Sequence, residues 1–123
     1  MGGFGISWIG ESKENCVQHR TPLKSSKFLI KAPGAGQVHV NLVGDPAKPG
    51  LYIRLAKWLP GNYSRPHMHD IERYFYVVSG AWWVSSSKTF DPATTYPMTT
   101  GTFVTHHANT VHFDGANKED GVI

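Results

Sequence analysis

The sequence has very little cysteine and no long apolar run. Cys16 is the single cysteine among 123 residues, so the chain can form neither an internal disulfide nor a multi-cysteine structural zinc site. No stretch approaches the roughly 18 consecutive apolar residues of a membrane span. The N-terminal residues have no basic flank that leads into an apolar segment, as a signal peptide would. We therefore expect a cytoplasmic protein that does not act at a membrane.

Excess charge is also absent from most of the chain. The formal net charge is +3, and residues 1–31 account for all of it, with five basic and two acidic side chains. Residues 32–123 carry seven basic and seven acidic side chains and have no basic stripe. Because nucleic-acid surfaces need clustered Lys and Arg, the sequence predicts that the body of the protein binds no nucleic acid.

Aromatic and turn-forming residues are abundant. Four Trp, five Tyr and six Phe exclude a disordered chain, and 13 Gly with 8 Pro are typical of a β protein. Short segments with the composition or alternation of strands recur at spacings near ten residues, without a convincing helix, which predicts an all-β sandwich or barrel. The expected strands cover residues 38–42, 51–58, 74–78, 81–84, 103–105 and 111–113.

Turn residues suggest how these strands are joined and where the domain begins. Ser79-Gly80 is expected to connect two strands as a hairpin, and residues 85–97 are expected to form a loop. Residues 1–31 lack strong periodicity and predict a loose N-terminal leader with short strands. A single domain is expected over residues 32–123.

Five of the seven histidines lie between residues 67 and 112. His67 and His69 are two residues apart, so in an extended segment both side chains point to the same side. His112, in the last expected strand, could complete a set of three imidazoles around one ion. Imidazole nitrogens bind Zn, Mn, Fe, Ni or Cu, so residue type alone does not choose the metal. An isolated His-x-His pair is more often a pair of surface residues than a metal site.

The spacing of glycines and histidines resembles the two motifs of the cupin superfamily. Gly61, His67, His69 and Gly80 match the first motif. Gly101, His107, Asn109 and His112 follow the spacing of the second. The resemblance implies a double-stranded β-helix, or jelly-roll barrel. By match to these motifs, His67, His69 and His112 are expected to bind a divalent transition metal ion, such as Zn, Mn, Fe or Ni.

The sequence departs from the family pattern at the usual fourth ligand. Arg73 occupies the position of the motif's Glu, and Glu72 stands one residue earlier. Arginine cannot bind a metal. Glu72 and His107 are therefore candidates for a fourth ligand, or for a group that supports the ligands through hydrogen bonds. We expect Arg73 to pair with Asp70, with Glu72 or with a bound anion.

Several functions are compatible with this set of residues. The first is a small metal-binding cupin that acts on a small organic ligand, anionic or cyclic, as an oxygenase, isomerase or lyase. The second is a metal-free anion pocket built around Arg73, and the third is a ligand-binding or sensing module without turnover. Arg73, Arg54 and Tyr52 are the candidate substrate contacts.

The two ends of the chain suggest an oligomer. Val122 and Ile123 are expected to begin a strand with no room to continue, only eleven residues after His112. This would leave an open barrel edge, which proteins rarely leave uncovered. Apolar segments at residues 4–9 and 28–30 are the available cover, and we expect them to pair across a two-fold axis in a homodimer.

Overall fold

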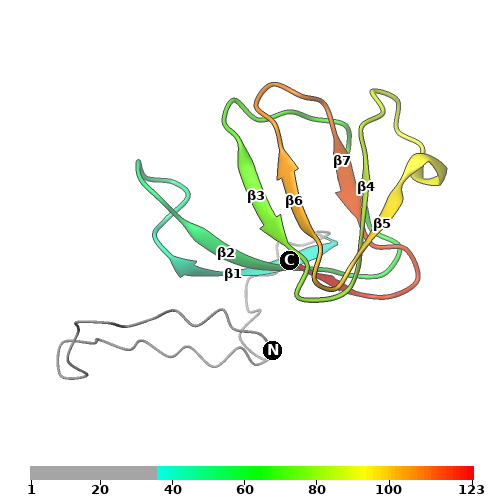
Figure 1. Cartoon of the computed structure of the whole chain (residues 1–123), viewed down its shortest axis with the longest axis horizontal. Helices are drawn as coiled ribbons and strands as arrows, with labels where there is room; N and C mark the ends of the chain where they lie inside the picture. Colours follow the sequence, from blue (N-terminus) through cyan, green and yellow to red (C-terminus); the bar gives the residue numbers. More distant parts are fainter. Residues whose placement is uncertain (1–35) are drawn as a thin grey trace, which may run out of the picture.

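The computed structural model describes residues 36–123, and the expected leader over residues 1–31 lies outside this part of the chain. The described part is almost entirely β-structure, which confirms the all-β prediction (Figure 1). None of its helical segments has the length and apolar character needed to cross a membrane. Its elements are β1 (Gln37–Val43), β2 (Ile53–Trp58), β3 (Arg73–Tyr76), β4 (Ser79–Ser85), the 3-10 helix η3 (Pro92–Thr94), β5 (Tyr96–Thr99), β6 (Phe103–His106), β7 (Phe113–Gly115) and β8 (Gly121–Val122).

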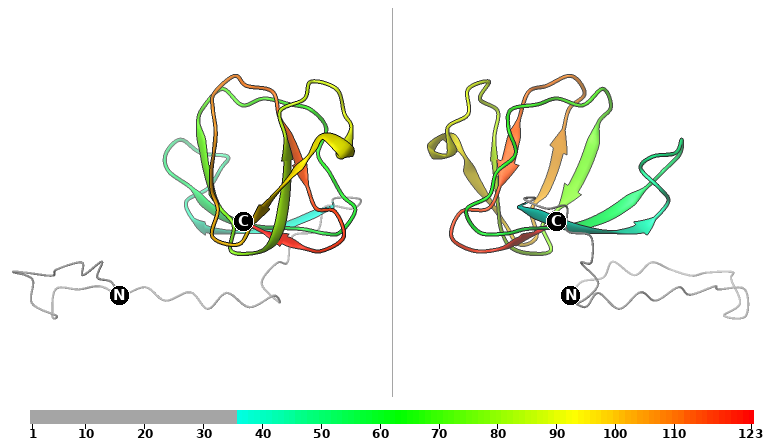
Figure 2. Two further views of the ribbon diagram at one scale, coloured as in Figure 1. Left: turned by 45° about the vertical axis from the view of Figure 1, so that its right-hand side comes forward. Right: turned by 180° about the vertical axis from the view of Figure 1, so that it is seen from behind.

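The strands form two antiparallel sheets. The larger sheet has the order β1-β2-β8-β4-β5, and β7 pairs with β4 beside β8. The smaller sheet consists of β3 and β6. The two sheets curve around a common interior (Figures 1 and 2). This is the jelly-roll barrel that the sequence predicts.

The barrel interior is filled by apolar side chains from both sheets. Val77, Trp82 and Phe113 are fully buried, and Phe75 of β3 packs against a core cluster that includes Val77 and Trp82. Along β3 the side chains alternate as in a half-buried strand, with Arg73 and Phe75 partly buried and the two tyrosines exposed. Arg73 therefore faces inward, as its spacing from His69 predicts.

The Ser79-Gly80 turn does not form the expected hairpin. Tyr76 of β3 pairs with Phe103 of β6 in the smaller sheet, whereas Gly80 pairs with Gly121 of β8 in the larger one. Gly80 has a φ of 70°, and a Cβ atom there would lie 1.9 Å from the carbonyl oxygen of Asp120. Glycine thus lets the chain cross from one sheet to the other in close contact with β8.

The expected loop over residues 85–97 ends in a strand that the sequence analysis missed. Tyr96–Thr99 forms β5, and Pro97 lies opposite Trp83 of β4. Proline has no backbone N–H to donate, which is unfavourable in a central strand. β5 is the outer strand of its sheet, where the missing donor is tolerated.

The last residues form a paired strand rather than an open edge. Gly121–Val122 forms β8, which lies between β2 and β4 and pairs with both. The backbone of Ile123 exchanges two hydrogen bonds with Ala56, of 2.8 and 2.9 Å. The expected terminal strand is present, but the expected unpaired edge beside it is wrong.

Candidate metal centre

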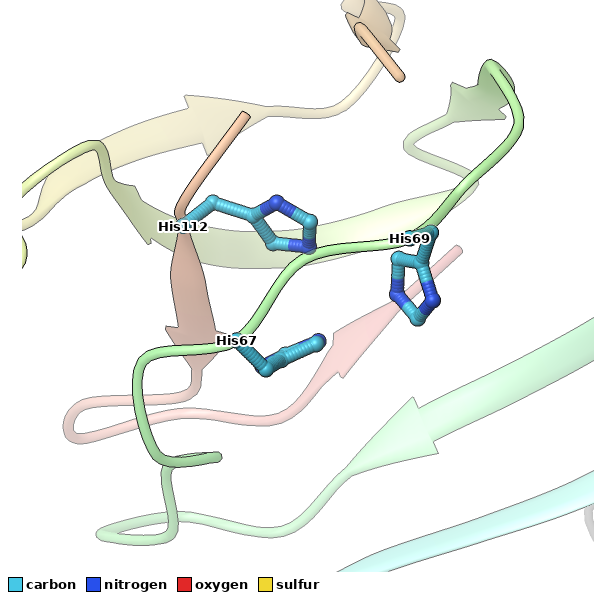
Figure 3. Close-up of side chains that lie close together, drawn as sticks. All are labelled: His67, His69 and His112. Atoms are coloured by element: carbon cyan, nitrogen blue, oxygen red, sulfur yellow. The ribbon is translucent and has the colours of Figure 1, made fainter. Parts of the chain in front are cut away.

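The fold brings His67, His69 and His112 together. Their candidate ligand atoms lie within 4.8 Å of one another. The ring centroids are 4.9 Å apart for His67 and His69, 4.5 Å for His67 and His112, and 5.3 Å for His69 and His112. Figure 3 shows the three rings pointing toward one another from two segments that lie side by side. The structure therefore assembles the set of three that the two motifs predict.

Backbone pairing explains why these side chains meet. His67 and His112 form an antiparallel bridge and exchange two backbone hydrogen bonds of 2.9 Å each. Residues directly opposite in such a pair project their side chains to the same face. The carbonyl of His69 accepts a 2.7 Å hydrogen bond from the backbone of Asn109, which adopts the left-handed conformation with a φ of 57°. This turn returns the chain toward His112.

Two of the three rings have their tautomer set by the backbone. Nδ1 of His67 lies 2.6 Å from the carbonyl oxygen of Arg65. Nδ1 of His112 lies 3.1 Å from the carbonyl oxygen of Thr110. A carbonyl oxygen only accepts, so each Nδ1 carries the proton and each Nε2 keeps a lone pair. Metal-binding histidines are typically held in this way.

The donor set fits a divalent transition metal ion. Burial is the main cause that lowers the pKa of His69 and of His112, and it favours the neutral form that binds metal. Tetrahedral coordination at zinc–nitrogen distances near 2.0 Å needs nitrogens about 3.3 Å apart. The present separations are within 4.8 Å, so the side chains would have to rotate toward one another to close the set.

A buried carboxylate lies near the three rings. Asp114 accepts hydrogen bonds from Trp82 Nε1 at 2.9 Å and from Ser64 Oγ at 2.8 Å. Its charge acts to raise the pKa of both His69 and His112, against the larger effect of burial. The sequence analysis missed this residue, although Asp114 follows His112 by two positions and so has the same strand parity.

Arg73 contacts the cluster directly. Its Nη1 lies 2.9 Å from His69 Nε2, and its Nη2 donates to the hydroxyl of Tyr52. A guanidinium only donates, so Nε2 of His69 is the acceptor and its lone pair is engaged. The expected pairing of Arg73 with Asp70 or Glu72 is not formed, because Arg73 turns inward.

Glu72 and His107 lie away from the cluster and bind each other. His107 Nδ1 lies 3.0 Å from Glu72 Oε1, and Tyr74 donates to Oε2 at 2.8 Å. The side chains of His107 and Glu72 are 71% and 46% exposed. These hydrogen bonds, the one from His107 first, lower the pKa of Glu72. A one-residue step along a strand reverses the face, and the candidate metal group among the described residues comprises the three histidines without Glu72 or His107.

The three candidate substrate contacts differ in their hydrogen-bond partners. Tyr52 and Arg73 lie together beside His69. Arg54 is engaged elsewhere, because its Nε donates to Asn41 Oδ1 at 3.0 Å. Its guanidinium carbon also lies 6.0 Å from the centre of the Tyr52 ring. Arg54 therefore contacts both strand β1 and Tyr52, whose ring centre also lies 5.9 Å from the guanidinium carbon of Arg73.

His106 is a further buried imidazole that the sequence analysis did not place in the site. Its ring centroid lies 3.9 Å from that of His112 and 4.7 Å from that of Phe75. Within residues 36–123, neither of its nitrogens has a hydrogen-bond partner. Burial, followed by the nearby His112, lowers the pKa of His106 to about 3. In the pairing of β3 with β6, His106 lies directly opposite Arg73, which explains why His106 is on the inner face.

Comparisons with known proteins give matches in structure only. No family model matches the sequence, and no curated protein does. A cupin superfamily protein from Desulfitobacterium hafniense superposes with a TM-score of 0.57 at 12% identity, over 86% of this chain and 90% of that one. The chain has a cupin-type fold. This confirms the fold that the motif resemblance implies.

Two further solved structures share this cupin-type fold. KdgF from Halomonas sp. matches with a TM-score of 0.56 and 22% identity, over 71% of this chain and 73% of that one. The polyketide cyclase RemF from Streptomyces resistomycificus matches with a TM-score of 0.56 and 17% identity. The match covers 71% of this chain and only 60% of RemF. At these low sequence identities, the matches show similarity of fold only.

Proposed function

We propose that this protein is a small metal-binding cupin that uses His67, His69 and His112 to hold one divalent transition metal ion. Zn, Mn, Fe and Ni all suit three neutral imidazoles. The observation that carries the proposal is the convergence of three ligand nitrogens within 4.8 Å, supported by the two Nδ1 protons directed at backbone carbonyls. When bound, such an ion supplies Lewis-acid chemistry to a ligand or to water.

A small organic ligand with an anionic group is the partner that the chain's own residues favour. Arg73 and Tyr52 place N–H and O–H groups beside His69. Phe75 and Trp82 form an apolar wall in the adjacent interior. Turnover of a small carboxylate by the metal-loaded protein would show that it is an enzyme, and the product would distinguish an oxygenase, an isomerase and a lyase. Saturable binding without turnover would assign a sensing module.

One observation favours a second candidate function, an anion pocket without metal. Arg73 already engages the lone pair of His69 Nε2, and its positive charge opposes the approach of a cation. In this reading Arg73 and Tyr52 bind a carboxylate, while the three histidines serve as neutral hydrogen-bonding groups. Tight binding of an anion to metal-free protein is the observation that would favour it.

The test is a calorimetric titration of metal-free, tag-free protein with Zn²⁺. We expect one ion per chain, and a loss of affinity of about 100-fold or more in each of His67→Ala, His69→Ala and His112→Ala. His107→Ala is the matched control, because that exposed ring binds Glu72, and its affinity should stay within about twofold of the parent. Unchanged Zn²⁺ binding in His69→Ala would refute the three-histidine site.

A further inference from the structure

Arg73 and a metal ion would compete for one lone pair. Nη1 of Arg73 donates to His69 Nε2 across 2.9 Å. His69 Nε2 can accept this hydrogen bond or bind an ion, but it cannot do both with one lone pair. Occupying the three-histidine site through this nitrogen therefore requires Arg73 to release His69.

The charges near the cluster make metal binding costly unless an anion is also present. A divalent ion and the guanidinium of Arg73 would lie close together. Asp114 is the buried carboxylate beside the rings, and its oxygens are already engaged by Trp82 and Ser64. Glu72 is held on the outer face by His107 and Tyr74. The positive charge of the loaded site thus exceeds the negative charge that these groups supply.

The groups around Arg73 are suited to bind a carboxylate. Arg73 uses Nη1 on His69 and Nη2 on Tyr52, and its guanidinium carries further N–H groups that these two contacts do not use. The Tyr52 hydroxyl accepts from Arg73, so its own proton is available for donation. A carboxylate that accepts from both residues would neutralise the guanidinium with charge-assisted hydrogen bonds.

We propose that Arg73 couples two ligands of this site, a divalent metal ion and a small carboxylate, so that each binds more tightly in the presence of the other. The carboxylate binds Arg73 and Tyr52 and draws the guanidinium away from His69 Nε2. A second oxygen on the same molecule, as in a 2-hydroxy acid, would face the three histidines. The inference rests on the proposed metal-binding function and assigns a ligand class to it. By linkage, the effect of one ligand on the other is reciprocal.

The experiment is a titration of metal-free protein with Co²⁺, followed by its visible absorption, with and without saturating glycolate. Glycolate carries one carboxylate and one hydroxyl. Ethylene glycol, which has the same number of carbons and no charge, is the matched control. We expect glycolate to lower the Co²⁺ dissociation constant about tenfold and ethylene glycol to leave it unchanged.

Two variants test the role of Arg73. Arg73→Met should bind Co²⁺ more tightly than the parent without glycolate, because His69 is released, and it should lose the glycolate effect. Tyr52→Phe removes only a hydroxyl and should weaken the glycolate effect. This second variant keeps the test decisive if Arg73→Met folds poorly. Equal Co²⁺ affinity with and without glycolate in the parent would overturn the coupling, as would a full glycolate effect in both variants.

The outcomes separate this inference from the function on which it rests. Co²⁺ binding that depends on His69 but not on glycolate refutes the coupling alone. Failure of the parent and of Arg73→Met to bind Co²⁺ under either condition refutes the metal site and the coupling together.

Discussion

The imidazole of His106 packs against that of His112 in a tilted arrangement, with ring centroids 3.9 Å apart and an interplanar angle of 39°. His106 is buried, and within the described residues neither of its nitrogens finds a hydrogen-bond partner. Protonation would place a charge in this apolar position, next to three other imidazoles. The pKa of His106 is accordingly lowered to about 3.

This environment predicts that the metal-free protein is acid-sensitive. An unfolded histidine titrates near 6.5, so between that pH and about 3 the unfolded chain binds more protons than the folded one. The contribution of His106 to the free energy of unfolding is full above pH 6.5 and falls as the pH decreases, by about 1.4 kcal/mol per pH unit. His69 and His112, whose pKa values are also lowered, act in the same direction. Urea unfolding between pH 7 and 5 measures the slope.

Replacing His106 by Phe provides the control for this prediction. The variant keeps a flat ring beside Phe75 and Trp82 but removes the titrating group. Its stability should decline less steeply over the same pH range. Identical slopes in the parent and in His106→Phe would show that His106 does not contribute to the acid sensitivity.

Substituting Glu for Arg73 should strengthen metal binding. The change removes the guanidinium from His69 Nε2 and places a carboxylate at the usual ligand position of the family motif. We expect Zn²⁺ affinity to rise about tenfold or more, since an opposite charge replaces a like one, as measured by calorimetry. Arg54→Glu makes the same charge change at a residue that binds Asn41 and should have a much smaller effect. Weaker binding in Arg73→Glu would mean that position 73 is not the ligand position.

Two glycines should respond differently to the same substitution. Gly61 and Gly80 have similar φ values of 77° and 70°, so alanine costs about 1–2 kcal/mol of backbone strain at either position. A Cβ atom at Gly61 has open space, whereas at Gly80 it would lie 1.9 Å from the backbone of Asp120. Gly80→Ala should therefore lower the thermal midpoint well below that of Gly61→Ala. Equal midpoints would contradict the close contact between Gly80 and β8.

Asp114→Asn should weaken both the fold and the metal site. An amide offers one acceptor oxygen in place of two, so Trp82 or Ser64 loses its partner, at a cost of about 1–3 kcal/mol in unfolding free energy. The loss of negative charge near His69 and His112 should also reduce Zn²⁺ affinity. Denaturant unfolding and calorimetry measure the two effects. Unchanged Zn²⁺ affinity in a folded variant would show that this carboxylate does not support the cluster.

Period-two patterns and motif spacing predicted the features that depend on local sequence. The strand at Gln37–Val43 and the inward direction of Arg73 follow from alternation, whereas the convergence of His67, His69 and His112 is what the resemblance to the cupin motifs implies.

Features that depend on contacts between distant segments could not be predicted in this way. The route of Gly80 into the larger sheet depends on β8, some forty residues away along the chain. The strand at Pro97 is permitted because it is an outer strand, which only the sheet order reveals. The burial of His106 and the pairing of Glu72 with His107 arise from the register of β3 with β6. The alternation of side chains along one strand does not reveal how that strand aligns with its partner.

The most direct test of the central claim is a crystal structure of the Zn²⁺-loaded protein with an anomalous difference map at the zinc edge. We expect one strong peak between His67, His69 and His112, with a nitrogen of each ring about 2.0–2.1 Å from it. No peak at that position, or a peak bound by other residues while these three rings remain unliganded, would contradict it.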